Sequence, residues 1–320
     1  MPTLLYHTGA LGDFITVLPT ITYWKKNRPG DHLVLLGKST IGDLALDAGL
    51  IDEAWDIDSP RFVPLFRDDF SPSATELLSV FDAAIAFADD SSPLLANLRR
   101  SGIAHLHSQK PFPEGRGVHV IDYHLSLMTD PSALSEGEKL PRLAPSEHSI
   151  ARSIELLPAG AAPVALHPGS GSRLKNWPSA RYRAMGDRLR NGGFAIAWIR
   201  GPADSAVDVP PGDLLVEEVT LQLLAAFLFR CTLFIGNDSG VAHLAAAVGC
   251  AAATIFGPSD PIIWSPRGPR VGIVNKNVDC SPCHGQTKVM YHCDGRCLRD
   301  ITVDDVASVA EGILKRREHT

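Results

Sequence analysis

Short apolar runs alternate with longer amphipathic stretches through the first half of the chain. The runs fit buried strands, and stretches with apolar side chains three or four residues apart fit helices. The expected strands are 3–7, 33–36, 81–87 and 103–106, and the expected helices are 14–24, 41–48 and 93–100. This alternation predicts a parallel sheet with helices on both faces.

The alternation restarts after a stretch rich in Pro, Ala and Ser at residues 140–163. The strands expected beyond it are 164–166, 194–199, 233–235, 252–256 and 271–274, and the helices are 150–157, 178–191, 220–229 and 241–248. We therefore predict an α/β protein with two doubly wound, Rossmann-like domains, 1–150 and 151–301, joined in this stretch.

Residues 302–320 are expected to form a terminal helix. Thr302 and Asp305 have the spacing of a capping box. The apolar stripe of this helix consists of Val303, Val306, Val309, Ala310, Ile313 and Leu314. Such a stripe must be buried, and we expect the helix to pack back towards the first domain.

The composition is that of a soluble globular protein. The 320 residues are 45% hydrophobic and 21% charged, with a net charge of −6. Nucleic acid is therefore not an expected partner, and an anionic ligand must be met by local groups. The sequence has no apolar run of about 18 residues and no secretory signal pattern at its start, so we expect a cytoplasmic protein.

The loop 236–240 (GNDSG) lies between an apolar strand and an Ala/Leu-rich helix, and therefore at the carboxyl edge of the second sheet. Helix N-terminal amides at such an edge favour an anion. Asp238 and Ser239 either cap the helix only or also face a ligand. His243, about one turn inside the helix, either packs the loop or contacts that ligand.

Two more loops are expected at the same edge. Residues 169–172 (GSGS), followed by Arg173 and Lys175, offer amides, hydroxyls and cationic groups that suit a phosphate or diphosphate. The glycine-to-lysine spacing excludes a P-loop. The third loop is 257–260 (GPSD).

A glycine-flanked turn also follows the first strand of the chain. Gly9 and Gly12 permit a sharp turn and close approach of a ligand. Asp13 is either an acidic residue that complements the helix dipole or a reactive carboxylate. Pro19 predicts that the following helix kinks or begins after Asp13.

Four motifs together resemble glycosyltransferase family nine, the heptosyltransferases of lipopolysaccharide core assembly and their relatives. The motifs are 9–13 (GALGD), 167–171 (HPGSG) with 175–178 (KNWP), 236–240 (GNDSG) with 243–245 (HLA), and 256–261 (FGPSDP). The resemblance covers nearly the whole chain. It implies the GT-B architecture, in which two domains face a central cleft, and metal-independent, inverting sugar transfer. The chain departs from the family at Tyr6-His7-Thr8, where many members carry an arginine.

The resemblance also implies roles for individual residues. Asp13 would be the catalytic base, and Lys175 would stabilise the departing diphosphate. The implied donor-binding residues are Ser170, Gly171, Ser172, Asp204, Asp238, Ser239, Gly240 and His243. Among them Asp204 matches a carboxylate for the nucleoside and Asp238 a position near the sugar hydroxyls. Gly9 and Gly12 would line the acceptor.

The implied reaction uses an ADP-sugar, with a heptose or related sugar, and needs no cofactor. The implied acceptor is a lipopolysaccharide core or another lipid-linked or oligosaccharide envelope glycan, with at most peripheral contact at the inner face of the inner membrane. Two other functions are open on the same architecture: a nucleotide-sugar epimerase or hydrolase, and a non-catalytic nucleotide-sugar-binding protein.

Four cysteines cluster near the end of the second domain. Cys280 and Cys283 are followed by Cys293 and Cys297, with two histidines, His284 and His292, between the pairs. These ligand types suit a structural zinc site. A disulfide and reduced, packed thiols are the alternatives. A catalytic metal is not expected here.

Overall fold

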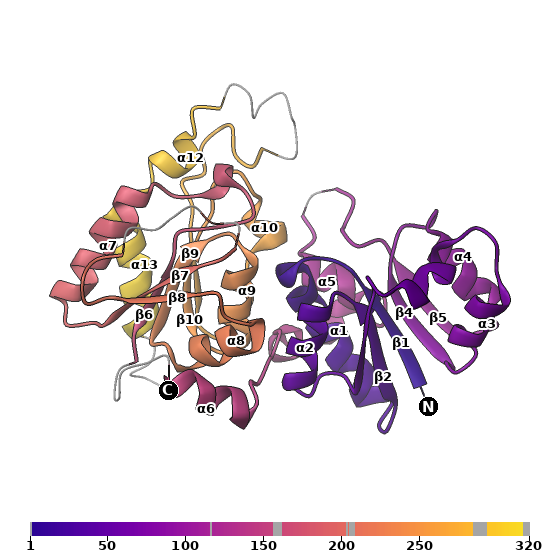
Figure 1. Cartoon of the computed structure of the whole chain (residues 1–320). Helices are drawn as coiled ribbons and strands as arrows, with labels where there is room; N and C mark the ends of the chain where they lie inside the picture. The colour runs from indigo at the N-terminus through magenta and orange to yellow at the C-terminus, as the bar shows by residue number, and fades with distance from the viewer. Residues whose placement is uncertain are drawn as a thin grey trace. The chain divides into compact units, whose positions relative to one another are not determined.

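The computed structural model describes residues 2–115, 117–155, 162–202, 204, 209–283 and 293–315. The chain forms two compact units, Met1–Lys139 and Leu140–Thr320, and each contains one parallel sheet with helices packed against it (Figure 1). Among the described residues no helix combines the length and apolar character needed to cross a membrane.

The first unit has a five-stranded sheet in the order β3-β2-β1-β4-β5. All of its strand pairs are parallel. The strands are β1 (Pro2–His7), β2 (His32–Gly37), β3 (Glu53–Asp56), β4 (Ala83–Phe87) and β5 (His105–Gln109). The helices are α1 (Leu11–Asn27), α2 (Ser39–Asp47), η1 (Pro60–Phe66), α3 (Pro72–Leu78), α4 (Pro93–Arg100), α5 (Val120–Leu125), η2 (Pro131–Ala133) and η3 (Glu136–Lys139).

The second unit has a six-stranded parallel sheet in the order β11-β10-β9-β6-β7-β8. The strands are β6 (Val164–His167), β7 (Ile196–Arg200), β8 (Leu214–Glu217), β9 (Leu233–Asn237), β10 (Ala251–Ile255) and β11 (Val271–Val274). The helices are α6 (Glu147–Glu155), η4 (Arg173–Lys175), α7 (Ser179–Asn191), α8 (Leu221–Arg230), α9 (Gly240–Ala247), α10 (Pro261–Trp264), α12 (Arg296–Arg299) and α13 (Val303–Lys315).

The central strands carry mostly apolar side chains because helices cover both faces of each sheet. All residues of β4, β9 and β10 are buried. Continuous burial explains why these strands were recognisable as apolar runs. The edge strand β3 is only half-buried, and its mixed sequence (EAWD) gave no such signal.

The terminal helix α13 begins with the expected capping box. The Thr302 amide donates to Asp305 Oδ2 over 2.7 Å, and the Asp305 amide donates to Thr302 Oγ1 over 3.2 Å. Its apolar stripe, however, packs into the core of the second unit, where Val306, Ala310 and Ile313 are buried beneath β10 and β11. This corrects the expectation that the stripe packs towards the first domain. Residues 316–320 lie outside the described residues.

Two boundaries also differ from expectation. The second unit begins at Leu140 rather than at residue 151, because α6 packs on α8 and the Leu143 amide donates to the Ala247 carbonyl. Helix α1 begins at Leu11 and contains Pro19, so of the two expected alternatives, a kink or a start after Asp13, the later start is wrong.

Candidate functional site

The loops after β6 and β9 lie side by side at the carboxyl edge of the second sheet. The chain runs from β6 outward to β7 and β8, then returns to β9 and runs outward the other way to β10 and β11. Strands β6 and β9 are neighbours, with His167 opposite Gly236. A reversal of strand order of this kind opens a crevice beyond the strand ends, where open α/β sheets bind their ligands.

The Asn237 side chain joins the two loops through hydrogen bonds. Its amide nitrogen donates to the carbonyls of Pro168 and Gly169 over 2.7 and 3.2 Å, and its side-chain oxygen accepts from the Trp177 amide over 2.9 Å. The Asn237 side chain is fully buried. Sequence reasoning gave it no role. An asparagine at the end of a buried strand must find hydrogen-bond partners, however, and therefore indicates a contact of this kind between loops.

Lys175 and Asp238 form an ion pair between the two loops. Lys175 Nζ lies 2.7 Å from Asp238 Oδ2, with the lysine side chain 37% exposed and the aspartate side chain 8% exposed. The expected ligand-facing residues of both loops thus meet. The pair leaves an accessible cationic group anchored by a buried carboxylate.

Ser239 caps helix α9. Its Oγ accepts a hydrogen bond from the Ala242 amide over 3.4 Å, and its extended backbone turns the chain into the helix. The aligned amides at this end, from Gly240 onward, carry the positive end of the helix dipole. Of the two expected caps only Ser239 occupies the N-cap position, while Asp238 pairs with Lys175.

His243 is buried against the ion pair. Burial lowers the pKa of the His243 imidazole to about 4, Asp238 acts to raise it and Lys175 to lower it. A hydrogen bond to the Trp264 backbone holds one side of the ring, and Nδ1 has no hydrogen-bond partner among the described residues. The imidazole is therefore neutral at physiological pH.

The hydroxyls of the 169–172 loop are used within the loop. Ser170 Oγ lies 2.7 Å from the Ser172 carbonyl and 2.6 Å from Asn176 Oδ1. Ser172 Oγ accepts from the Leu174 amide over 3.4 Å and caps η4. These bonds shape the loop, and Gly171 between them is exposed.

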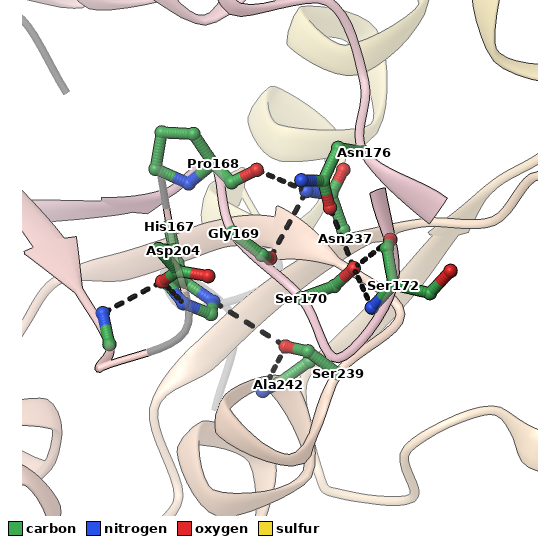
Figure 2. A network of polar contacts seen from close by, with 11 residues as sticks. His167, Pro168, Gly169, Ser170, Ser172, Asn176, Asp204, Asn237, Ser239 and Ala242 are labelled. Carbon is green, nitrogen blue, oxygen red and sulfur yellow. Dashed lines mark hydrogen bonds and ion pairs between the residues drawn. The ribbon is translucent and has the colours of Figure 1, made fainter. Parts of the chain in front are cut away.

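His167 and Asp204 form a buried pair behind this loop (Figure 2). His167 Nε2 lies 3.1 Å from Asp204 Oδ2, and the Gly201 amide donates to the same oxygen over 2.7 Å. His167 Nδ1 lies 3.5 Å from Ser239 Oγ. Asp204, expected near a nucleoside, thus pairs with His167, a motif residue to which sequence reasoning gave no role.

The third expected loop follows β10. Asp260 Oδ1 accepts from the Ile262 amide over 2.9 Å and caps the short helix α10. Gly257 has no room for a side chain, since a Cβ there would overlap Leu298. The loop is therefore closely packed at Gly257. Ile262, next to the loop, is 64% exposed.

In the first unit, the turn after β1 also lies at a reversal of strand order, because β1 is flanked by β2 and β4. Asp13 is the third residue of α1, and its Oδ2 accepts from the Ala10 amide over 2.8 Å. A Cβ on Gly9 would overlap both the Asp13 side chain and the His7 ring. Gly9 is therefore required for the packing of this turn.

His7 belongs to a buried histidine group that sequence reasoning did not identify. Its ring packs edge-on against Phe14 and Phe87, and Phe87 in turn packs edge-on against His124. Burial lowers the pKa of His7 to about 4 and that of His124 to about 3. Both rings are held neutral beneath the Asp13 turn.

The four clustered cysteines carry free thiols. Burial raises the pKa of the Cys297 thiol to about 11, and Cys293, Cys283 and Cys280 also act to raise it. Among the described residues no group of three or more His, Cys, Asp and Glu side chains is arranged to hold a metal ion. The two histidines between the pairs, His284 and His292, lie outside the described residues.

Comparison with known sequences points to one family. Residues 94–293, more than half of the chain, match the family model described as glycosyltransferase family 9 (heptosyltransferase). Lipopolysaccharide heptosyltransferase 3 of Escherichia coli is 28% identical over 163 residues, which are 47% of this chain and 48% of that protein. The chain thus spans about half the length of the curated relatives it matches.

Comparison with solved structures covers the whole chain. A family 9 glycosyltransferase from Veillonella parvula superposes with a TM-score of 0.78 at 18% identity, over 98% of this chain and 97% of that one. The E. coli ADP-heptose lipopolysaccharide heptosyltransferase II gives a TM-score of 0.76 at 16% identity, over 99% of this chain and 100% of that one. These matches confirm the expected fold class, an α/β protein with two parallel-sheet units of GT-B type.

Proposed function

We propose that this chain, which belongs to glycosyltransferase family 9, is an inverting transferase that moves a heptose or related sugar from an ADP-sugar to an envelope glycan. The observation that carries the proposal is the Lys175–Asp238 pair beside the N-terminus of α9, at the strand-order reversal of the second sheet. The family assignment supplies the reaction class, and the name of the E. coli structural relative supplies the ADP-heptose donor.

The second unit would hold the donor. The ammonium of Lys175 and the amides at the start of α9, from the N-cap Ser239 and from Gly240, suit the diphosphate, which gains charge as the glycosidic bond breaks. The exposed backbone at Gly171 allows close approach of the same group. Asp238, oriented by Lys175, would accept hydrogen bonds from sugar hydroxyls beside buried His243.

The first unit would supply the base. Transfer with inversion needs a carboxylate that takes the proton of the acceptor hydroxyl as that oxygen attacks the anomeric carbon. Asp13 is our candidate, because its carboxylate is fixed by the Ala10 amide at a glycine-flanked turn at the strand-order reversal of the first sheet. Gly9 and Gly12 would let the acceptor approach. The acceptor we propose is a lipopolysaccharide core or another lipid-linked envelope glycan, reached from the cytoplasmic side.

A donor and acceptor panel tests the proposal. ADP-heptose and ADP-, UDP-, GDP- and CMP-hexoses are incubated with heptose- and Kdo-terminated core oligosaccharides, and products are identified by mass spectrometry and anomeric NMR. We expect transfer from an ADP-sugar with inversion, undiminished by EDTA. Rapid consumption of donor without acceptor would favour an epimerase or hydrolase. Tight donor binding with no turnover on any acceptor would favour a binding protein.

A further inference from the structure

His167 connects a buried carboxylate to the helix cap of the proposed donor site. The residue is 3% exposed, and the two nitrogens of its ring point to two different loops (Figure 2). Nε2 faces Asp204 at 3.1 Å, and Nδ1 faces Ser239 Oγ at 3.5 Å. This Asp–His–Ser array joins residues that lie far apart in the sequence.

The chemistry of Asp204 fixes which ring nitrogen carries the proton. Burial acts to raise the pKa of Asp204, but hydrogen bonds from His167 and the Gly201 amide outweigh it and hold the pKa below its ordinary value. The carboxylate is therefore ionised and can only accept, so Nε2 of His167 must carry a hydrogen. In a neutral ring Nδ1 is then an acceptor.

This arrangement uses the only hydrogen that the Ser239 hydroxyl can donate. The oxygen accepts the Ala242 amide hydrogen, and the single hydroxyl hydrogen is directed to the acceptor Nδ1 of His167. A diphosphate oxygen at the start of α9 also needs a donor. Ser239 can offer its hydrogen to the diphosphate only if Nδ1 stops accepting it.

A proton on Nδ1 resolves this competition. The protonated ring donates from Nδ1 to Ser239 Oγ, and the serine hydroxyl is released to donate to the diphosphate. The ionised carboxylate of Asp204 stabilises the resulting imidazolium, as an aspartate does beside the histidine of a Ser-His-Asp triad. The negative charge of a bound diphosphate also stabilises the protonated ring.

We propose that His167 is a positioning residue that takes up a proton when a nucleoside diphosphate-sugar binds, and that it thereby directs the Ser239 hydroxyl to the diphosphate, with Asp204 orienting the ring. This inference rests on the proposed function, because it places the diphosphate of the donor at the N-terminus of α9. It assigns Asp204 to the ring of His167 rather than to the nucleoside.

Gly169 supports this role for Asp204. A Cβ at position 169 would overlap the Asp204 carboxylate, so the glycine is what admits Asp204 to the ring of His167. Four other charged side chains on the described parts of the neighbouring loops and strands form ion pairs of their own. Lys175 and Asp238 pair with each other beside His243, and Arg200 at the end of β7 pairs with Glu217.

Titration calorimetry with an intact ADP-sugar tests the inference. ADP-glucose is the probe, because its diphosphate is a diester that does not itself titrate near neutral pH. Binding to the full chain is measured in two buffers of different protonation enthalpy and over a range of pH. We expect a net uptake of up to about one proton on binding, and an affinity that falls by up to about tenfold per pH unit over the range in which the uptake occurs.

Variants separate this role from a structural one. The amide of His167→Asn can donate towards Ser239 without taking up a proton, so we expect binding that is independent of pH, with no proton uptake. Ser239→Ala should abolish the uptake while His167 remains. Asp204→Asn should reduce the uptake at a given pH. The control His148→Gln changes an exposed histidine of the same unit and should behave as wild type.

The outcomes distinguish the two proposals. Wild-type binding without proton uptake, or equal uptake by His167→Asn and wild type, overturns the role of His167 and leaves the proposed function standing. That wild-type measurement does not depend on the folding of any variant. Failure of the wild type to bind any ADP-, UDP-, GDP- or CMP-sugar overturns both.

Discussion

Lys175 Nζ and Asp238 Oδ2 lie 2.7 Å apart, and this contact joins the loops after β6 and β9. The pair is asymmetric in its exposure to solvent, because the lysine side chain is 37% exposed and the aspartate side chain 8%. The buried carboxylate orients the partly exposed ammonium. In the proposed reaction a diphosphate would therefore meet a preoriented cation, and little reorganisation would be needed to stabilise its charge.

Lys175→Met should impair both binding and turnover. Loss of the ammonium removes charge stabilisation of the diphosphate and leaves Asp238 unpaired, so we expect kcat/KM to fall about 100-fold or more, with a raised KM for the donor. Steady-state kinetics with the active donor measure this. Lys276→Met is the matched control, since it breaks an ion pair with Asp305 in the same unit. Equal effects of the two changes would contradict the role of Lys175.

Asp13→Asn should separate chemistry from donor binding. The amide cannot take the proton of an acceptor hydroxyl, so kcat should fall about 10²- to 10⁴-fold. The donor dissociation constant should stay within about twofold of wild type, because the donor residues lie in the second unit. Asp43→Asn, at an exposed position on α2, controls for charge removal from the same unit. Wild-type turnover by Asp13→Asn would remove the base assignment.

Gly169→Ala should disturb the proposed donor site by displacing Asp204 from His167. The added methyl group would overlap the Asp204 carboxylate and push it from His167 and Gly201. We expect at least about tenfold weaker ADP-sugar binding and a loss of roughly 1–3 kcal/mol in stability, as displaced buried polar groups lose their partners. Calorimetry and thermal melts measure both. Gly312→Ala adds a methyl group into open space in the same unit and should weaken neither ADP-sugar binding nor stability.

The first unit should lose stability in acid because of His7 and His124. Burial lowers the pKa of His7 to about 4, with Lys38 acting in the same direction, and that of His124 to about 3, with His7 and His119 acting in the same direction. The unfolded chain binds these protons near pH 6.5. The stabilisation is therefore complete above about pH 6.5 and is lost as the pH falls towards the folded values, by about 1.4 kcal/mol per pH unit and histidine.

Urea titrations that follow the unfolding of the first unit, repeated between about pH 7 and pH 5, measure this loss of stability. His124→Phe should reduce the slope of stability against pH by roughly half, since one of the two titrating rings is gone. His105→Gln changes an exposed histidine of the first unit and should leave the slope unchanged. An unchanged slope in His124→Phe would show that buried imidazoles do not set the acid sensitivity.

The sequence by itself determined the elements whose signal is local. Continuous apolar runs identified β4, β9 and β10, because strands covered on both faces need no polar side. The capping box of α13 was readable because Thr302 and Asp305 are three residues apart. The short or edge elements β3 and α5 have mixed sequences, and their signals were too weak to detect.

Tertiary structure alone decided which groups meet. Lys175 and Asp238 are 63 residues apart in the sequence and His167 and Asp204 are 37 apart, so only the adjacency of β6, β7 and β9 brings them together. The surface against which the apolar stripe of α13 packs could not be predicted either, because an amphipathic helix requires an apolar surface without specifying which one. A chain encodes such contacts through the packing of the whole unit, and no spacing along the sequence records them.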